Sequence, residues 1–146
     1  MRLDNARRVG NSALRIFLCV CLAVAAVAAY AVQESMERIG IQELKKMMDE
    51  GTAVTIIDVQ PADVYAEGHI QGAISIPWKS QIALEDVFSL PQDQLIFVYC
   101  DCGPGEADSA DAAKQLFQMG YEKVKVLGDP SIKGWRQAGY PMETKK

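Results

Sequence analysis

Apolar side chains recur every three or four residues in several segments that end at Gly or Pro, which is the pattern of short amphipathic helices. The expected helices cover residues 41–50, 81–90, 109–119 and 132–138, and a helical turn runs from Pro61 to Tyr65 and ends near Gly68. In the helix over 109–119, the side chains expected to face the core are Ala112, Ala113, Leu116 and Phe117.

Short and almost uniformly apolar runs lie between these helices and predict buried β-strands. They cover residues 53–59, 74–76, 95–99 and 123–127, and the clearest is 95–99, which is apolar throughout. Strands that alternate with helices favour an α/β fold with an open, mostly parallel central sheet flanked by helices on both faces. In such sheets the chemistry usually lies beyond the carboxyl ends of the strands, here after Tyr99.

The N-terminal segment differs from the rest of the chain. Residues 1–32 combine four arginines with an uncharged apolar run over 16–32. This pattern predicts either a secretory signal peptide, cleaved after Ala31, or a retained membrane anchor, because the run is close to the about 20 residues that span a bilayer. Both alternatives predict an exported, periplasmic or extracytoplasmic body, since the arginines stay in the cytoplasm. Cys19 and Cys21 are interpreted as small apolar residues of this run.

The charge of the remaining chain excludes one class of function. The sequence has 15 basic and 19 acidic residues, and residues 1–32 hold four of the former and one of the latter, which leaves a net charge of −7 for the body. Nucleic-acid binding requires clustered Lys and Arg that neutralise phosphates, so no nucleic-acid partner is expected.

The candidate chemistry follows the central strand. Cys100 lies between this strand and the next helix, whose first turn presents unpaired N–H groups and a partial positive charge that stabilise a thiolate. Gly103 and Gly105 let the loop fold around the sulfur. Cys100 is therefore a candidate nucleophile that could carry a persulfide; the alternative is an ordinary core cysteine. The candidate loop consists of Cys100, Asp101, Cys102, Gly103, Pro104, Gly105, Glu106, Ala107, Asp108 and Ser109.

Two sets of residues resemble the two halves of a rhodanese-like domain. The first set is Ile57-Asp58-Val59, Tyr65, Gly68-His69-Ile70, Gly72-Ala73-Ile74 and Ile76-Pro77; the second is Val98-Tyr99-Cys100, Ser109, Ala112-Ala113, Leu116, Gly120-Tyr121, Val126-Leu127-Gly128, Trp135 and Ala138-Gly139-Tyr140-Pro141. The resemblance covers residues 36–143. It implies that Cys100 takes sulfur from a small-molecule or protein-borne persulfide donor and passes it to a thiol acceptor, without a cofactor. It also places Asp58 and His69 in a structural signature.

The loop departs from the common rhodanese pattern. It is longer and has no Arg, and it resembles a subgroup with a Cys-x-Cys loop, relative to which it has one additional residue. It also carries Asp101, Glu106 and Asp108. A carboxylate within about 6 Å disfavours a thiolate by roughly 2–3 kcal/mol, more than the about 0.3–1 kcal/mol gained at a helix end. We therefore expect thiosulfate to be a poor donor and a neutral or protein-borne persulfide to be a better one.

Several alternatives remain open at this level. Cys102 is either incidental or a resolving thiol that forms a disulfide with Cys100. His69 is interpreted as a structural hydrogen-bonding residue, and no metal site is expected, because Cys-x-Cys supplies only two ligands. Two rival functions are a non-catalytic binding module that docks partners on the same loop, and a thiol–disulfide redox protein that uses Cys100 and Cys102.

Overall fold

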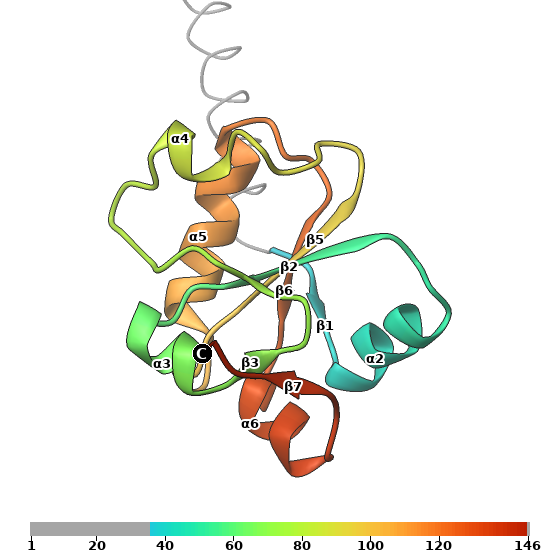
Figure 1. Cartoon of the computed structure of the whole chain (residues 1–146). Helices are drawn as coiled ribbons and strands as arrows, with labels where there is room; N and C mark the ends of the chain where they lie inside the picture. Colours follow the sequence, from blue (N-terminus) through green and yellow to red (C-terminus); the bar gives the residue numbers. More distant parts are fainter. Residues whose placement is uncertain (1–35, 146) are drawn as a thin grey trace, which may run out of the picture. The chain divides into compact units, whose positions relative to one another are not determined.

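The structure is a computed structural model that describes residues 36–145 (Figure 1). The predicted signal peptide or membrane anchor over 1–32 lies outside these residues. Within the described part, none of the helices combines the length and the apolar character needed to cross a membrane.

The order of elements confirms the predicted alternation of strands and helices. The strands are β1 (Arg38–Ile39), β2 (Val54–Asp58), β3 (His69–Ile70), β4 (Ile74–Ser75), β5 (Leu95–Tyr99), β6 (Val124–Leu127) and β7 (Met142–Glu143). The helices are α2 (Ile41–Asp49), α3 (Ala62–Glu67), α4 (Leu84–Val87), α5 (Ala107–Gln118) and α6 (Ser131–Gln137).

Five strands form one sheet in the order β1-β6-β5-β2-β4, and every neighbouring pair in it is parallel. A separate antiparallel pair joins β3 to β7. The chain runs outward from β2 to β4 on one side and from β5 through β6 on the other, so the order reverses between β2 and β5. In parallel sheets this switch point opens a crevice at the carboxyl ends of the two strands.

Helices cover both faces of the sheet, as predicted (Figure 1). Alternate residues of β5 point to opposite sides. Ile96, Val98 and Cys100 pack in one apolar cluster with side chains of α4 and α5. Phe97 and Tyr99 pack in a second cluster with side chains of α2 and α6. Cys100 therefore lies on the α5 face at the end of the central strand.

The structure corrects some predicted boundaries. The helix expected over 81–90 is only Leu84–Val87, because Ala83 before it has an extended backbone with φ −79° and ψ 148°. The N–H of Ile82 donates to Gln115 Oε1 at 2.6 Å. Helix α5 begins at Ala107, two residues before the expected start. The sequence did not predict β1, β3 or β7. Each has two residues, which is too short for a hydrophobic period to show.

One predicted core residue is wrong. Phe117 was expected to face inward, but it is 42% exposed, while Ala112, Ala113 and Leu116 are buried as predicted. Phe117 is turned by about 100° around the helix axis from the buried Leu116, which places it at the edge of the apolar stripe of α5.

Candidate active site

The candidate site lies at the switch point between β2 and β5. Asp58 and Tyr99, the last residues of these strands, are register partners. The chain that follows β2 supplies Gln60 and Pro61, and the chain that follows β5 supplies Cys100, to a pocket of about 240 Å³. We call this pocket the sulfur pocket.

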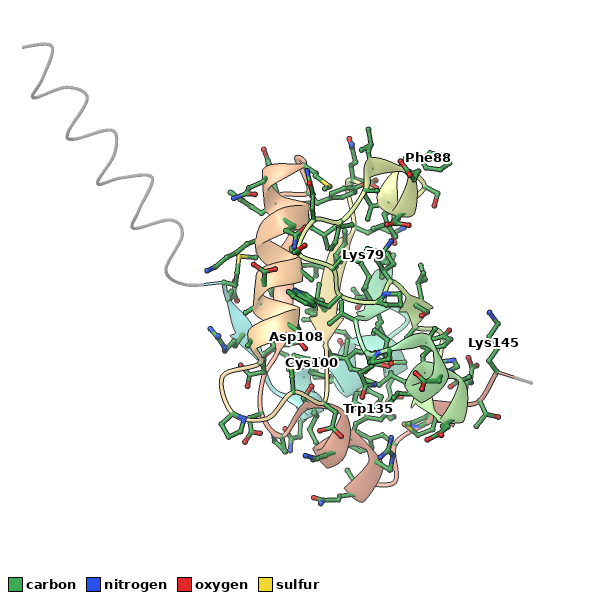
Figure 2. All side chains as sticks on the ribbon, turned by 90° about the vertical axis from the view of Figure 1, so that its left-hand side faces the viewer. Lys79, Phe88, Cys100, Asp108, Trp135 and Lys145 are labelled. Atoms are coloured by element: carbon green, nitrogen blue, oxygen red, sulfur yellow. A yellow bond between two sulfur atoms is a disulfide. The ribbon has the colours of Figure 1, made fainter. Side chains whose placement is uncertain are left out.

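Cys100 is almost entirely buried, yet it lines the sulfur pocket together with Cys102 and Asp108. Figure 2 shows Cys100 and Asp108 close to the N-terminal end of α5. Within residues 36–145, the backbone N–H groups of Ala107 and Asp108 donate to no protein acceptor. These are the unpaired donors of a helix start, and they lie in the chain segment next to the sulfur.

Cys100 and Cys102 are joined by a disulfide in this structure, with their Cα atoms 5.4 Å apart. This Cα separation falls in the ordinary range for bridged cysteines. The two thiols are therefore close enough to react with each other, which is the geometry that a resolving thiol needs.

The remaining loop residues shape the backbone. Gly103 and Gly105 have φ values of +79° and +93°, which favour glycine, and among residues 36–145, apart from the chain neighbours, no atom lies within 4 Å of a Cβ added at either position. Pro104 and Ala107 do not line the sulfur pocket. Ser109 is buried, with Oγ 3.5 Å from Cys100 Sγ, and it donates to the carbonyl of Glu106 at 3.1 Å.

Glu106 holds the loop to two distant parts of the chain. Its backbone has a φ of +44°, which is uncommon for a non-glycine residue. Its carboxylate is buried and accepts from Arg38 Nε of β1 at 2.9 Å and from the N–H of Asp129 at 2.7 Å. A third tie is the hydroxyl of Ser131, which donates to the carbonyl of Cys100 at 3.0 Å.

Several acidic side chains near the sulfur have partners that the sequence alone does not reveal. Lys133 of α6 pairs with Asp101 at 2.9 Å, and Arg38 pairs with Glu106. Trp78 Nε1 donates to Asp111 at 2.9 Å. The charges of Asp101 and Glu106 are therefore compensated by cations that the fold brings from far along the chain. Asp108 lines the sulfur pocket and has no ion pair among the described residues.

Asp58 holds Gln60, which lines the sulfur pocket, and Tyr99, which precedes Cys100. Its carboxylate accepts from the Tyr99 hydroxyl at 2.6 Å and from the backbone and side chain of Gln60 at 2.8 and 3.0 Å. Burial raises the pKa of Asp58 above its ordinary value, and the hydrogen bonds from Tyr99 and Gln60 oppose this rise. Burial and the neighbouring Asp58 raise the pKa of the Tyr99 phenol, which keeps the hydroxyl protonated as the donor.

His69 does not line the sulfur pocket. Its Nδ1 donates to the carbonyl of Tyr65 at 2.8 Å, its ring stacks on the Tyr65 ring, and its Nε2 lies 3.8 Å from Glu143. These contacts connect β3 to α3 and β7. They describe a structural role.

A second pocket, of about 430 Å³, adjoins the sulfur pocket and shares Gln60, Val64 and Asp101 with it. We call it the rim pocket. Arg136 of α6 is among its lining residues. Apart from Asp101, the sequence did not predict the residues that line the rim pocket. The carboxyl-end rule, applied to β2 as well as to β5, could have identified Gln60, but nothing in the sequence places α6 beside the loop.

A family model described as a rhodanese-like domain matches residues 40–138. The chain therefore belongs to the rhodanese-like domain family. Solved structures agree with this assignment. BH2092 from Bacillus halodurans is 30% identical with a TM-score of 0.66, and the match covers 84% of this chain and 86% of that one. The rhodanese-like domain of Alr3790 from Anabaena sp. is 28% identical with a TM-score of 0.61, covering 75% and 80%.

Curated relatives include proteins named as sulfurtransferases. The HTH-type transcriptional regulator Rv0324 of Mycobacterium tuberculosis is 36% identical over 144 residues, covering 94% of this chain and 61% of that protein. The probable adenylyltransferase/sulfurtransferase MoeZ of the same species is 34% identical, covering 65% and 24%. The thiosulfate sulfurtransferase PspE of Escherichia coli is 33% identical, covering 53% and 78%. The chain thus spans less than two thirds of the length of Rv0324 and about a quarter of MoeZ.

Proposed function

We propose that this chain is an exported sulfurtransferase that relays sulfane sulfur through a persulfide on Cys100. In this proposal residues 1–32 are a signal peptide or membrane anchor, and residues 36–143 are a single catalytic domain. The supporting observation is the position of Cys100, which directly follows the central strand β5, lines the sulfur pocket and precedes the unpaired N–H groups of α5. The relatives named as sulfurtransferases add support.

The first step loads sulfur onto the enzyme. A thiol reductant opens the Cys100–Cys102 disulfide, and the Cys100 thiolate then attacks the sulfane sulfur of a donor persulfide. A new S–S bond forms at Cys100 Sγ, the S–S bond of the donor breaks, and its electron pair leaves with the donor thiolate. The helix start and the loop N–H groups stabilise the negative charge of the persulfide. The Ser109 hydroxyl, which is a rotor, can turn from the Glu106 carbonyl to donate to the sulfur.

The second step unloads it in one of two ways. An acceptor thiolate attacks the outer sulfur, which returns the electron pair to Cys100 and yields an acceptor persulfide. Alternatively, the Cys102 thiolate attacks Cys100 Sγ. The outer sulfur then leaves as hydrosulfide, and the two cysteines are oxidised to the disulfide that the structure contains. The thiol reductant completes the cycle in this second case.

The disulfide also favours a second candidate function, a thiol–disulfide redox protein. In that case Cys100 and Cys102 exchange electrons with a partner dithiol and no sulfur is carried. The two functions differ in whether a sulfur atom is bound between the half-reactions.

The adduct retained by Cys102→Ser separates these candidates, because both functions release one sulfide for each disulfide that an alkyl persulfide forms. The reduced full-length chain is treated with a neutral alkyl persulfide, and sulfide and free thiols are measured for the wild type, Cys100→Ser and Cys102→Ser. The proposal predicts release of one sulfide for each disulfide formed in the wild type, none in Cys100→Ser, and retention of sulfur on Cys102→Ser. Disulfide formation without sulfur uptake would favour the redox function. No reaction at Cys100 with any donor would favour a docking module.

A further inference from the structure

The rim pocket contains two opposite charges that the fold does not use. Arg136 of α6 and Glu67, the last residue of α3, both line it. Among the described residues neither side chain forms an ion pair or a side-chain hydrogen bond, whereas nearby Lys133 and Asp101 pair with each other. A cavity lined by an uncommitted guanidinium and an uncommitted carboxylate suits a ligand that carries both charges.

The walls of this pocket are tied together by backbone contacts. Strand β7 pairs with β3, with Met142 opposite Ile70. The N–H of Lys145 donates to the carbonyl of Ala66 at 3.1 Å, which anchors the intervening Thr144 beside α3. Met142 and Thr144 both line the pocket. The wall of the rim pocket next to Glu67 is therefore formed by a segment that backbone hydrogen bonds hold to β3 and α3.

The rim pocket adjoins the sulfur pocket, in which Cys100 would carry the sulfur. Gln60 and Val64 line both pockets, and so does Asp101, the residue after Cys100. The volume of about 430 Å³ lies within the roughly 300–1,000 Å³ typical of small-ligand sites. A ligand with its head group in the rim pocket can thus direct a short arm toward Cys100.

We propose that the rim pocket is the binding site for the head group of an α-amino-acid thiol, of which cysteine is the simplest, as the sulfur acceptor. Its α-carboxylate binds the Arg136 guanidinium, its α-ammonium binds Glu67, and its thiol enters the sulfur pocket. This assignment depends on the proposed sulfur transfer.

The step conserves atoms and electrons. The acceptor thiol loses its proton to solvent, and its thiolate attacks the outer sulfur of the Cys100 persulfide. The bond between that sulfur and Cys100 Sγ breaks, Cys100 keeps the electron pair, and the amino-acid persulfide leaves. The charges of such a ligand lie several bonds from its sulfur. They therefore occupy the rim pocket, away from Asp108 in the sulfur pocket.

The test is a single turnover with matched acceptors. The full-length Cys102→Ser chain is loaded with inorganic polysulfide, desalted and mixed with cysteine, N-acetylcysteine (no ammonium) or cysteamine (no carboxylate). Loss of the adduct from the Cys100 peptide is followed by mass spectrometry after alkylation. Each thiol is compared only with itself across variants, so that differences in intrinsic thiol reactivity cancel.

We expect Arg136→Gln to raise the half-saturating concentration of cysteine by about fivefold, the effect of one partly exposed ion pair, and to leave the maximal rate unchanged. The rise should be much smaller with cysteamine. Glu67→Gln should raise the half-saturating concentration of cysteine more than that of N-acetylcysteine. Lys123→Gln and Glu122→Gln are matched controls, because they make the same charge changes just before β6, at the amino-terminal end of this parallel strand and away from the carboxyl ends where the site lies, and should change neither value.

A second measurement needs no sulfur transfer. Calorimetric titration of the wild-type chain with S-methylcysteine, which cannot react, should show binding that Arg136→Gln weakens. If no persulfide forms on Cys100, the proposed function fails and this titration alone decides the pocket. If the persulfide forms but cysteine transfer and S-methylcysteine binding are the same in Arg136→Gln as in the wild type, the acceptor site is refuted while the relay stands.

Discussion

Glu106 offers a sharp test of how the active-site loop is held. Its side chain is 6% exposed, and it joins the loop to Arg38, whose side chain is 44% exposed, and to the N–H of Asp129. Its backbone lies in the left-handed region at φ +44°. Substitution with Gln removes the charge, substitution with Ala removes both contacts, and substitution with Gly removes both contacts but also relieves the backbone.

These differences give an order of stabilities. The ion pair contributes about 1 kcal/mol, because Arg38 is partly exposed to solvent. The hydrogen bond from Asp129 to a buried carboxylate contributes about 1.5 kcal/mol or more. Glu106→Gln should therefore lower the free energy of unfolding by about 1–2 kcal/mol and Glu106→Ala by about 2–4 kcal/mol. Glu106→Gly should be about 1 kcal/mol more stable than Glu106→Ala, although glycine gains more freedom in the unfolded chain.

The assay is urea unfolding of the full-length chain, followed by tryptophan fluorescence, with the disulfide reduced in every sample. Glu122, an exposed residue with no left-handed backbone, is the control position, where Gly should not be more stable than Ala. If Glu106→Ala were as stable as Glu106→Gly, or if Glu106→Gln were as stable as the wild type, the proposed role of Glu106 in holding the loop would be refuted.

Three further predictions concern the chemistry of the site. The raised pKa of Asp58 means that the native state holds this proton more tightly than the unfolded chain, so its contribution to stability falls as pH rises from its ordinary value of 3.8 through the raised value; the difference in unfolding free energy between wild type and Asp58→Asn should shrink over that window, and a difference that grows with pH would contradict it. Ser109→Ala should slow loading of Cys100 by about tenfold in stopped reactions, through loss of one hydrogen bond to the anionic sulfur, and an unchanged rate would exclude that role. Thiosulfate should load Cys100 at least about tenfold more slowly than a neutral persulfide, because no loop Arg binds it and Asp108 lines the pocket, and equal rates would overturn the expected donor preference.

The parts of the fold that sequence patterns predicted are those with a strong local signal. Residues 95–99 are apolar throughout and form β5, and the apolar stripe of 109–119 forms most of α5. A strand that is apolar throughout is buried on both faces of its sheet, and helices must cover both faces. The α/β fold class could therefore be predicted from the pattern. Strands β1, β3 and β7 have no such signal, since each has two residues and exists only through a partner strand, whereas β4 was predicted from the apolar residues of 74–76.

The candidate site divides in the same way. Cys100 and Cys102 could be identified because a strand, a thiol and a helix follow one another in the chain. The partners of the loop could not, because Arg38 lies 68 residues from Glu106 along the sequence. Lys133 likewise reaches Asp101 only because the chain folds back. Local charge counts therefore overestimated the acidity around the sulfur.

The most direct test of the proposed relay is the mass of the peptide that contains Cys100. The reduced full-length chain is exposed to a neutral alkyl persulfide, alkylated and digested, and the wild type is compared with Cys100→Ser and Cys102→Ser. We expect an increase of about 32 Da, one sulfur atom, on the Cys100 peptide of the wild type and more of it in Cys102→Ser, which cannot release the sulfur by closing the disulfide. Sulfur uptake that persists elsewhere in Cys100→Ser, or a Cys100 peptide that never gains this mass, would contradict a persulfide relay at Cys100.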